Sequence, residues 1–234
     1  MGHSTWNVDP IRILTRREIA AVLCNLMQRS AKSCNARLNR TVFRLACCCG
    51  LRVSEIANLR LSDVHVEGGR PHLHIRPEGA KGGRRRNVAL WWDQGTLDDI
   101  ALWKGERQAL GAKSEDHFVC CLRPGRYGEG LIRHTIRERF RTACKPLGLE
   151  RLKTLTIHHG RHTFISHALA GGRTLAEVRI AAGHGSLMTT SAYLHVAVDD
   201  DGKVGNLFDL LSDSVAATFG DSSSFRERRP PTYQ

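Results

Sequence analysis

The chain has 234 residues, which is enough for one full domain or two small ones, and 41% of them are hydrophobic, which is enough for a buried core. It carries 35 lysines and arginines against 23 aspartates and glutamates, and the resulting net charge of +12 favours a polyanionic partner such as nucleic acid. The longest apolar stretches, such as Leu45 to Leu51, are far too short to span a membrane, and Met1–Pro10 lacks the apolar core of a secretion signal.

The eight cysteines indicate a reducing compartment rather than a disulfide framework. Cys47, Cys48 and Cys49 are adjacent, as are Cys120 and Cys121, and neighbouring cysteines rarely bridge each other. No C-x-x-C spacing typical of a zinc ribbon occurs. We therefore expect small, buried, reduced cysteines in a cytoplasmic protein.

The first part of the chain predicts three helices. Thr15 and Glu18 form a capping box, and apolar residues then recur at helical spacing. A second helix is expected over residues 36–49, ending at Gly50, and a third over residues 53–59. Residues 64–90 instead alternate between apolar and polar side chains, with glycine pairs at the expected turns. This pattern predicts an antiparallel sheet of about three strands, followed by a helix over residues 93–110.

Residues 131–147 predict an amphipathic helix with two parallel stripes. One stripe is basic, with cations every four residues, and the other is apolar and consists of Ile132, Ile136, Phe140, Cys144 and Leu147. Like charges at this spacing repel, and a polyanion lying along the helix would relieve the repulsion. We therefore expect DNA contacts here, although a solvated helix face remains the alternative. The basic stripe consists of Arg133, Arg137, Arg141 and Lys145.

The last ordered part, residues 156–196, reads as short helices separated at Gly171, Gly172 and Gly183. Thr174 and Glu177 form another capping box. After Asp199 the composition turns to Asp, Ser, Gly and Pro, which predicts a tail with a possible short helix over residues 204–211 and disorder beyond it. The fold class that follows is mainly α with a small antiparallel β-sheet, an α+β class.

Four places carry residues suited to chemistry on an anion. Arg52 follows a glycine turn at a helix start, with Glu55 one turn on, and Lys81 lies in a glycine-rich hairpin. His158 and Arg161 are three residues apart, hence on one helix face, and Gly183-His184 precedes Tyr193 by nine residues. Each signal alone has an ordinary structural explanation. Their order along one chain makes a specific combination.

This combination resembles the tyrosine recombinase, or phage integrase, family. The similarity is close in GLRVSEIANLRLSDV and HHGRHTFISHALAGGRTLAEVRIAAGHGSLMTTSAYLHV. It extends more weakly through LTRREIAAVL, KGGRRRNVAL and GLIRHTIRERFRTACKPLGL, and so covers residues 13–196.

The resemblance implies a role for each matching residue. Arg52 and Arg161 would clamp the scissile phosphate, and Glu55 would support the arginine site. Lys81 would protonate the leaving 5′ oxygen. His158 would assist proton transfer, and His184 would hydrogen-bond a phosphate oxygen. Tyr193 would attack the phosphate and form a 3′-phosphotyrosyl link, without ATP, metal or another cofactor.

Elementary chemistry agrees with these roles. A free tyrosine has a pKa near 10, so that only about one in a thousand is ionised at pH 7. The site must therefore supply about 4 kcal/mol through a base or positive surroundings. Arginines provide positive surroundings together with forked donors for phosphate oxygens. Further basic residues expected to contact DNA are Arg84, Arg85 and Arg86 in the hairpin.

The resemblance also sets expectations for organisation and partners. Residues 1–12 would be a flexible segment, residues 13–198 the catalytic domain and residues 199–234 the tail, with no separate N-terminal core-binding domain. Double-stranded DNA would be the partner, bound by a homotetramer on paired sites, with no membrane involved. Two positions depart from the family pattern, because Gly160 and Ala182 stand where leucine is common; both look like packing positions.

Three other interpretations remain open. A metal hydrolase would use the pair His158 and His162, which are four residues apart, but no carboxylate or cysteine completes a ligand set at useful spacing. Another alternative is a catalytically inactive or fragmentary DNA-binding relative. A third concerns only a side activity, DNA relaxation, because a type IB topoisomerase uses similar chemistry. Tyr127 and Tyr233 are poor alternatives as nucleophile, since they fall in an expected loop and the tail.

Overall fold

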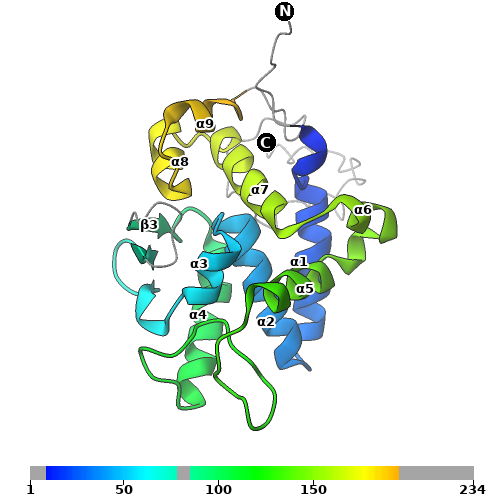
Figure 1. The fold of residues 1–234 in the computed structure, drawn as a ribbon, viewed down its shortest axis with the longest axis vertical. Helices are drawn as coiled ribbons and strands as arrows, with labels where there is room; N and C mark the ends of the chain where they lie inside the picture. The colour runs from blue at the N-terminus through cyan, green and yellow to red at the C-terminus, as the bar shows by residue number, and fades with distance from the viewer. Residues whose placement is uncertain (1–8, 78–84, 195–234) are drawn as a thin grey trace, which may run out of the picture.

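The computed structural model describes residues 9–77 and 85–194. Its helices are α1 (Arg16–Ser30), α2 (Cys34–Phe43), α3 (Val53–Asn58), α4 (Gln94–Ala109), α5 (Arg133–Ala143), α6 (Leu149–Thr154), α7 (Ile157–Ala170), α8 (Leu175–Ala182) and α9 (Leu187–Ser191) (Figure 1). Short 3-10 turns lie at η1 (Pro10–Arg12), η3 (Leu61–Asp63) and η5 (Lys145–Leu147), and α2 continues into a π-helical turn, η2 (Arg44–Cys48). Mainly helical structure with a small sheet confirms the predicted fold class.

The helix starts follow the sequence signals. The Thr15 hydroxyl accepts from the Glu18 backbone N–H at 3.2 Å, and the Glu18 carboxylate accepts from the Thr15 N–H at 2.8 Å, so the predicted capping box begins α1. The predicted box of Thr174 and Glu177 begins α8 in the same way. Both boxes satisfy backbone donors that have no partner inside the helix.

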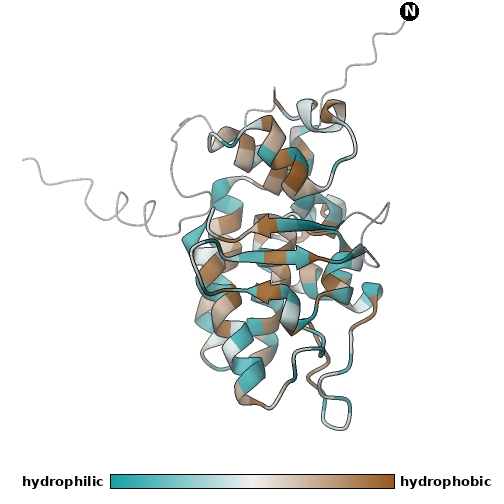
Figure 2. Ribbon diagram, turned by 90° about the vertical axis from the view of Figure 1, so that its left-hand side faces the viewer, coloured by the Kyte–Doolittle hydropathy of each residue, from teal (hydrophilic) through white to brown (hydrophobic). Residues whose placement is uncertain are grey.

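The sheet has three antiparallel strands in the order β1 (Val64–His65), β2 (His72–Ile75) and β3 (Arg86–Ala89). Figure 2 shows the sheet at the surface in front of the helices, with polar and apolar residues alternating along the strands. Val64, Leu73 and Val88 are fully buried on its inner face. The predicted alternation is confirmed, and α8 packs beside β3.

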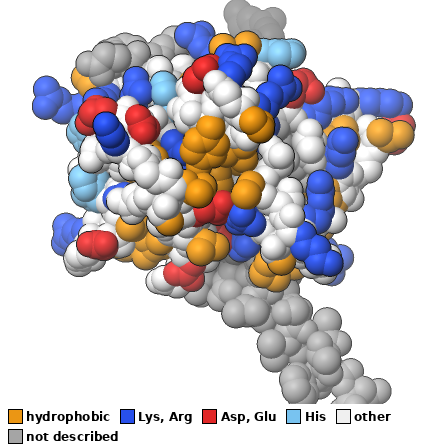
Figure 3. Space-filling view, turned by 90° about the horizontal axis from the view of Figure 1, so that it is seen from below, with side chains coloured by type: hydrophobic (Ala, Val, Ile, Leu, Met, Phe, Trp, Pro, Cys, Tyr) orange, Lys and Arg blue, Asp and Glu red, His pale blue; other side chains and the backbone are white. Residues whose placement is uncertain are grey.

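The hydrophobic core joins α1, α2, η2, α3, α5 and α7 to the inner face of the sheet. The eight cysteines are all free thiols; five are buried, whereas Cys34 is exposed. No described helix has the length and apolarity needed to cross a membrane. The end of the molecule away from α8 and α9 is shown in Figure 3, where hydrophobic side chains gather centrally and lysines and arginines lie around them.

Helix α5 is shorter than the predicted segment of residues 131–147. Ile132 is its N-cap and is 69% exposed, so it does not belong to the buried apolar stripe, whereas Ile136 and Phe140 are buried as predicted. The helix ends at Ala143, and Lys145 lies in the separate turn η5 with Pro146. Proline at this point is compatible with the start of a new turn but not with a continuing helix interior.

Candidate active site

The site begins at the turn into α3. Gly50 has φ +64°, and a Cβ there would lie 2.4 Å from a Phe164 ring carbon, so glycine is required both for conformation and for space. Arg52 follows as the N-cap of α3, and its backbone N–H donates to the Glu55 carboxylate at 2.8 Å. The Arg52 guanidinium donates to the same carboxylate at 2.9 Å and to the Gly183 carbonyl at 3.4 Å. Arg52 is thus held at a helix start, as predicted.

The Glu55 carboxylate is buried and is shared by a second arginine, Arg86 at the start of β3. Arg86 donates to both Glu55 oxygens, at 2.9 and 2.8 Å, and to the Ala181 carbonyl at 2.8 Å. Burial alone would raise the pKa of Glu55, but hydrogen bonds and charge from Arg86 and Arg52 lower it overall. Glu55 therefore stays ionised between the two guanidinium groups.

The buried position of Arg86 differs from the surface DNA contact expected from the sequence. Its side chain is only 5% exposed, and the donors just described point inward to Glu55 and α8. Arg86 shares the inner face of β3 with Val88, while Asn87 between them is exposed. The structure thus gives Arg86 an internal role, fixing the β3 end of the hairpin against α3 and α8.

Arg161, on α7, brings the second predicted guanidinium to the same place. It donates to the Gly50 carbonyl at 2.9 Å and also to the Ala182 carbonyl. Its pKa is lowered to about 9, first because burial disfavours the charged form and then because Arg52 repels it. An anion bound beside Arg52 and Arg161 would relieve this repulsion, and arginine forks match phosphate oxygens.

The approach of α7 depends on Gly160, directly before Arg161. A Cβ at Gly160 would lie 2.9 Å from the carbonyl carbon of Ala46, so this glycine lets α7 lie against the backbone of η2. Ala182, the other departure from the family pattern, is fully buried and offers its carbonyl to Arg161. Both positions are packing positions, in agreement with the prediction.

His184 follows the left-handed C-cap Gly183, which has φ +63°. Its Nδ1 lies 2.9 Å from the hydroxyl of Thr190, which is fully buried on α9. The pKa of His184 is lowered to about 4 by burial and by Arg161 and Arg52. The imidazole is therefore neutral at physiological pH and can donate a hydrogen bond without adding charge.

Tyr193 lies just after α9 with its ring buried, 7% exposed. Its hydroxyl is 2.6 Å from Nδ1 of His162 on α7, and the two rings stack with centroids 5.7 Å apart. Burial raises the pKa of Tyr193, while Arg161 and Arg12 oppose this effect. The structure thus brings the predicted nucleophile within electrostatic range of Arg161, one of the two predicted arginines.

The remaining predicted residues are placed as follows. Lys81 and Arg84 lie outside the described residues, and Arg85 is exposed at the hairpin base. His158 is exposed in the first turn of α7. Arg133 and Arg137 are exposed on α5, whereas Arg141 donates to the Leu152 carbonyl at 2.9 Å and Lys145 is exposed in η5.

The sequence patterns did not predict the positions of two residues at the site, His162 and Arg86. His162 was considered only as half of a metal pair with His158, although it directly follows Arg161 on α7. Arg86 was grouped with its arginine neighbours, although its two-residue spacing from Val88 indicated the inner face of a strand. Across the described residues, no group of three or more His, Cys, Asp or Glu is arranged to hold a metal ion.

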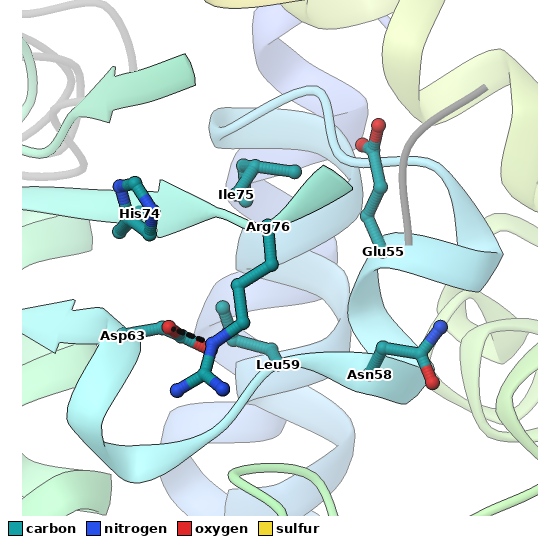
Figure 4. Close-up of a pocket in the computed structure, with 7 residues that line it drawn as sticks. All are labelled: Glu55, Asn58, Leu59, Asp63, His74, Ile75 and Arg76. Atoms are coloured by element: carbon teal, nitrogen blue, oxygen red, sulfur yellow. Dashed lines mark hydrogen bonds and ion pairs between the residues drawn. The ribbon is translucent and has the colours of Figure 1, made fainter. Parts of the chain in front are cut away.

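A small pocket on the other side of Glu55 does not belong to this site. It lies between α3 and β2 and is lined by Glu55, Asn58, Leu59, Asp63, His74, Ile75 and Arg76. Figure 4 shows Arg76 paired with Asp63 and the Glu55 carboxylate turned away from that pair. The carboxylate thus faces the arginine site rather than the pocket.

Comparison with known proteins identifies the family. Residues 15–199 match the phage integrase family. The chain belongs to this family. A curated tyrosine recombinase XerD from Halalkalibacterium halodurans is 29% identical over 185 residues, covering 79% of this chain and 57% of the relative. The chain spans about half the length of the curated relatives it matches.

Solved recombinase structures share the fold. The crystal structure of XerA recombinase has a TM-score of 0.61 at 18% identity and covers 90% of this chain and 64% of that one. XerH site-specific recombinase bound to palindromic difH substrate, in a post-cleavage complex, has a TM-score of 0.61 at 22% identity and covers 88% and 52%.

Proposed function

We propose that the protein is a site-specific DNA recombinase that cuts and rejoins strands through a 3′-phosphotyrosyl intermediate. The observation that carries the proposal is that Arg161 on α7 lies within electrostatic range of three other groups from distant parts of the chain. These are Arg52 before α3, His184 after α8 and Tyr193 after α9. Family membership and the DNA-bound XerH relative support double-stranded DNA as substrate.

In this proposal the site holds one backbone phosphate. Arg52 and Arg161 donate to its non-bridging oxygens and stabilise the charge that builds on them in the transition state. Neutral His184 donates a further hydrogen bond. Tyr193 attacks phosphorus, and Lys81 protonates the departing 5′ oxygen, which is a poor leaving group as an alkoxide. His158, exposed at the start of α7, assists proton transfer.

Rejoining reverses these steps, because the phosphotyrosyl link conserves the energy of the broken bond. A freed 5′ hydroxyl attacks the link and releases Tyr193. Exchange between two duplexes requires several subunits, for which we propose a homotetramer on paired sites. An inactive or fragmentary DNA-binding relative is the alternative, and it predicts binding without covalent attachment.

The test is covalent attachment to DNA. Nicked suicide duplexes tiled across the DNA that flanks the gene are incubated with protein in EDTA, and adducts are resolved on denaturing gels. We expect an adduct with the wild-type chain and with Tyr127→Phe, a control on the exposed tyrosine of the loop before α5. Tyr193→Phe should bind DNA with unchanged affinity and give no adduct. An adduct that survives in Tyr193→Phe would contradict the assignment.

A further inference from the structure

The contact between Tyr193 and His162 is the shortest route for the phenolic proton in the described site. Nδ1 of His162 lies 2.6 Å from the Tyr193 oxygen, within the normal range for a hydrogen bond to a hydroxyl. The stacked rings fix the direction of this contact as well as its length. His158, one helical turn earlier on α7, is exposed.

The surroundings of His162 keep its imidazole neutral. Its pKa is lowered to about 4, first by burial and then by positive or titratable neighbours. The groups that face it are His158, His159 and Arg161 on α7, Arg12 on η1, Tyr193 after α9, and His184 after α8. A neutral imidazole whose Nδ1 lone pair meets a phenol can accept its proton.

We propose that His162 is the general base that accepts the proton of Tyr193 during attack on the phosphate. The proposal rests on the proposed recombinase function and adds a catalytic residue to it. His162 qualifies as catalytic because it touches the attacking oxygen itself.

The step balances without any further reactant. The phenolic proton moves from the Tyr193 oxygen to Nδ1 of His162, and the freed electron pair forms the bond to phosphorus. The bond from phosphorus to the 5′ oxygen breaks, and that oxygen takes a proton from the acid assigned to Lys81. On rejoining, the His162 imidazolium returns its proton to the Tyr193 oxygen as the 5′ hydroxyl gives its own back to Lys81.

Binding of DNA would strengthen this base. A nearby phosphate is an opposite charge for an imidazolium and raises the pKa of His162 from its low value in the free protein. Proton transfer then becomes more favourable only when a phosphate is in place. The same arrangement limits tyrosinate formation in the protein without DNA.

The first test separates proton transfer from positioning. His162→Asn places an amide oxygen where Nδ1 lies, so that a hydrogen bond to Tyr193 can persist without a base. We expect single-turnover adduct formation at pH 7 to slow by about 10² to 10⁴-fold, the usual range for loss of general acid–base catalysis. His159→Gln is the control, because His159 lies on the same helix with its ring centroid 6.1 Å from that of His162. A wild-type rate in His162→Asn would overturn the proposal.

The second test measures how the cleavage rate depends on pH. Wild-type cleavage should depend less steeply on pH between 6 and 8 than cleavage by the variant, because a neutral His162 imidazole accepts the phenolic proton. In His162→Asn the attacking species must be pre-formed tyrosinate, so the rate should rise about tenfold per pH unit below the pKa of tyrosine. A flat profile in the variant, or a faster rate than wild type, would overturn the proposal; the faster rate would mean that His162 restrains Tyr193.

A modified substrate distinguishes the base from the acid. In a duplex whose scissile 5′ bridging oxygen is replaced by sulfur, the leaving thiolate needs little protonation. Lys81→Ala should recover adduct formation on this DNA, whereas His162→Asn should remain slow. Recovery of His162→Asn would assign His162 to the leaving group and overturn the proposal.

A measurement on the free protein separates this proposal from the proposed function. Nitrogen NMR of the histidine side chains should show His162 neutral at pH 6, with an unprotonated, hydrogen-bonded Nδ1 whose signal shifts in Tyr193→Phe. A protonated Nδ1 on a neutral ring, or no response to Tyr193→Phe, would overturn the proposal whether or not DNA is cleaved. Failure of the recombinase function alone would instead appear as no adduct with wild type and an unchanged NMR result.

Discussion

Glu55 is the residue on which both sides of the arginine site depend. It is buried and accepts from Arg52 on its own helix and from Arg86 on β3. Two guanidinium groups this close would repel each other without the carboxylate between them. A buried charge that loses its partner is costly, which makes this residue more important for stability than a surface ion pair.

Glu55→Gln should therefore lower the free energy of unfolding by about 3 to 5 kcal/mol, the range seen when one partner of a buried ion pair is removed. Denaturant titration measures the change. Glu150→Gln is the control, because Glu150 forms only an exposed pair with Lys153, and it should change stability by less than about 1 kcal/mol. Equal losses in the two variants would contradict this role for Glu55.

The same residue predicts a pH dependence. Because the pKa of Glu55 in the folded protein lies below its usual value of 4.5, the unfolded state binds more protons as the pH falls. The stability that Glu55 contributes is thus fully present above about pH 5 and is lost at lower pH. Thermal melts from pH 6 to pH 3 should show a shallower loss in Glu55→Gln than in wild type.

For single residues, the sequence predicted which residues belong to the site better than it predicted the contacts they make. Arg161 lies within electrostatic range of Arg52, His184 and Tyr193, and the catalytic roles of these residues stay a prediction. His162 could not be assigned, because its partner Tyr193 is 31 residues away and reaches it only through packing of α7, α8 and α9. Arg86 could have been placed inward from strand alternation alone.

At the scale of elements, the contact between α7 and η2 carries Arg161 to the site. Gly160 allows this contact, since any side chain there would meet the Ala46 backbone. Backbone atoms cannot move aside as a flexible side chain can. The approach of α7 to η2 therefore depends on the absence of a side chain at Gly160.

Gly160→Ala should destabilise the protein by about 1 to 3 kcal/mol, as overpacking of a close contact does. Gly105→Ala is the matched control. Gly105 is a helical glycine in α4 with open space around its Cβ position, so alanine should stabilise by about 0.5 to 1 kcal/mol. Chemical denaturation compares the two variants. A Gly160→Ala variant more stable than wild type would contradict the prediction and show that the η2 backbone moves to accommodate the methyl group.

Secondary structure was more predictable than its boundaries. Capping boxes and apolar spacing gave α1, α8 and the sheet because these signals are local. The segment around α5 was predicted too long, since residues 131–147 share one periodic pattern while the chain leaves the helix at Cys144. The predicted helix over residues 204–211 lies outside the described residues.

At the scale of the whole molecule, the proposed binding to DNA predicts that the net charge of +12 acts through exposed cations. Arg133 and Arg137 are exposed on α5, whereas arginines such as Arg44, Arg86 and Arg151 form ion pairs within the chain. Formal charge therefore overstates the number of cations available to phosphates. Salt dependence of binding measures that number directly.

Arg137→Gln should weaken DNA binding at every sequence tested and reduce the slope of log affinity against log salt by about 1. Arg126→Gln removes the same formal charge from a loop where Arg126 is paired with Glu129, and it should leave the slope unchanged. Fluorescence anisotropy over a range of salt concentrations measures both. Equal slopes for wild type and Arg137→Gln would show that Arg137 on α5 does not contact DNA phosphates.

Main-chain carbonyl groups orient the side chains of Arg52 and Arg161. Arg161 donates to the carbonyls of Gly50 and Ala182, and Arg52 donates to the carbonyl of Gly183. A carbonyl oxygen is present whatever side chain a residue carries, so mutation at Ala182 cannot delete the acceptor. The direction of the two guanidinium groups is therefore protected against most point mutations, and it is vulnerable mainly where φ is positive, at Gly50 and Gly183. If the proposed recombinase function holds, engineering of altered DNA specificity can vary surface residues while these two glycines are kept.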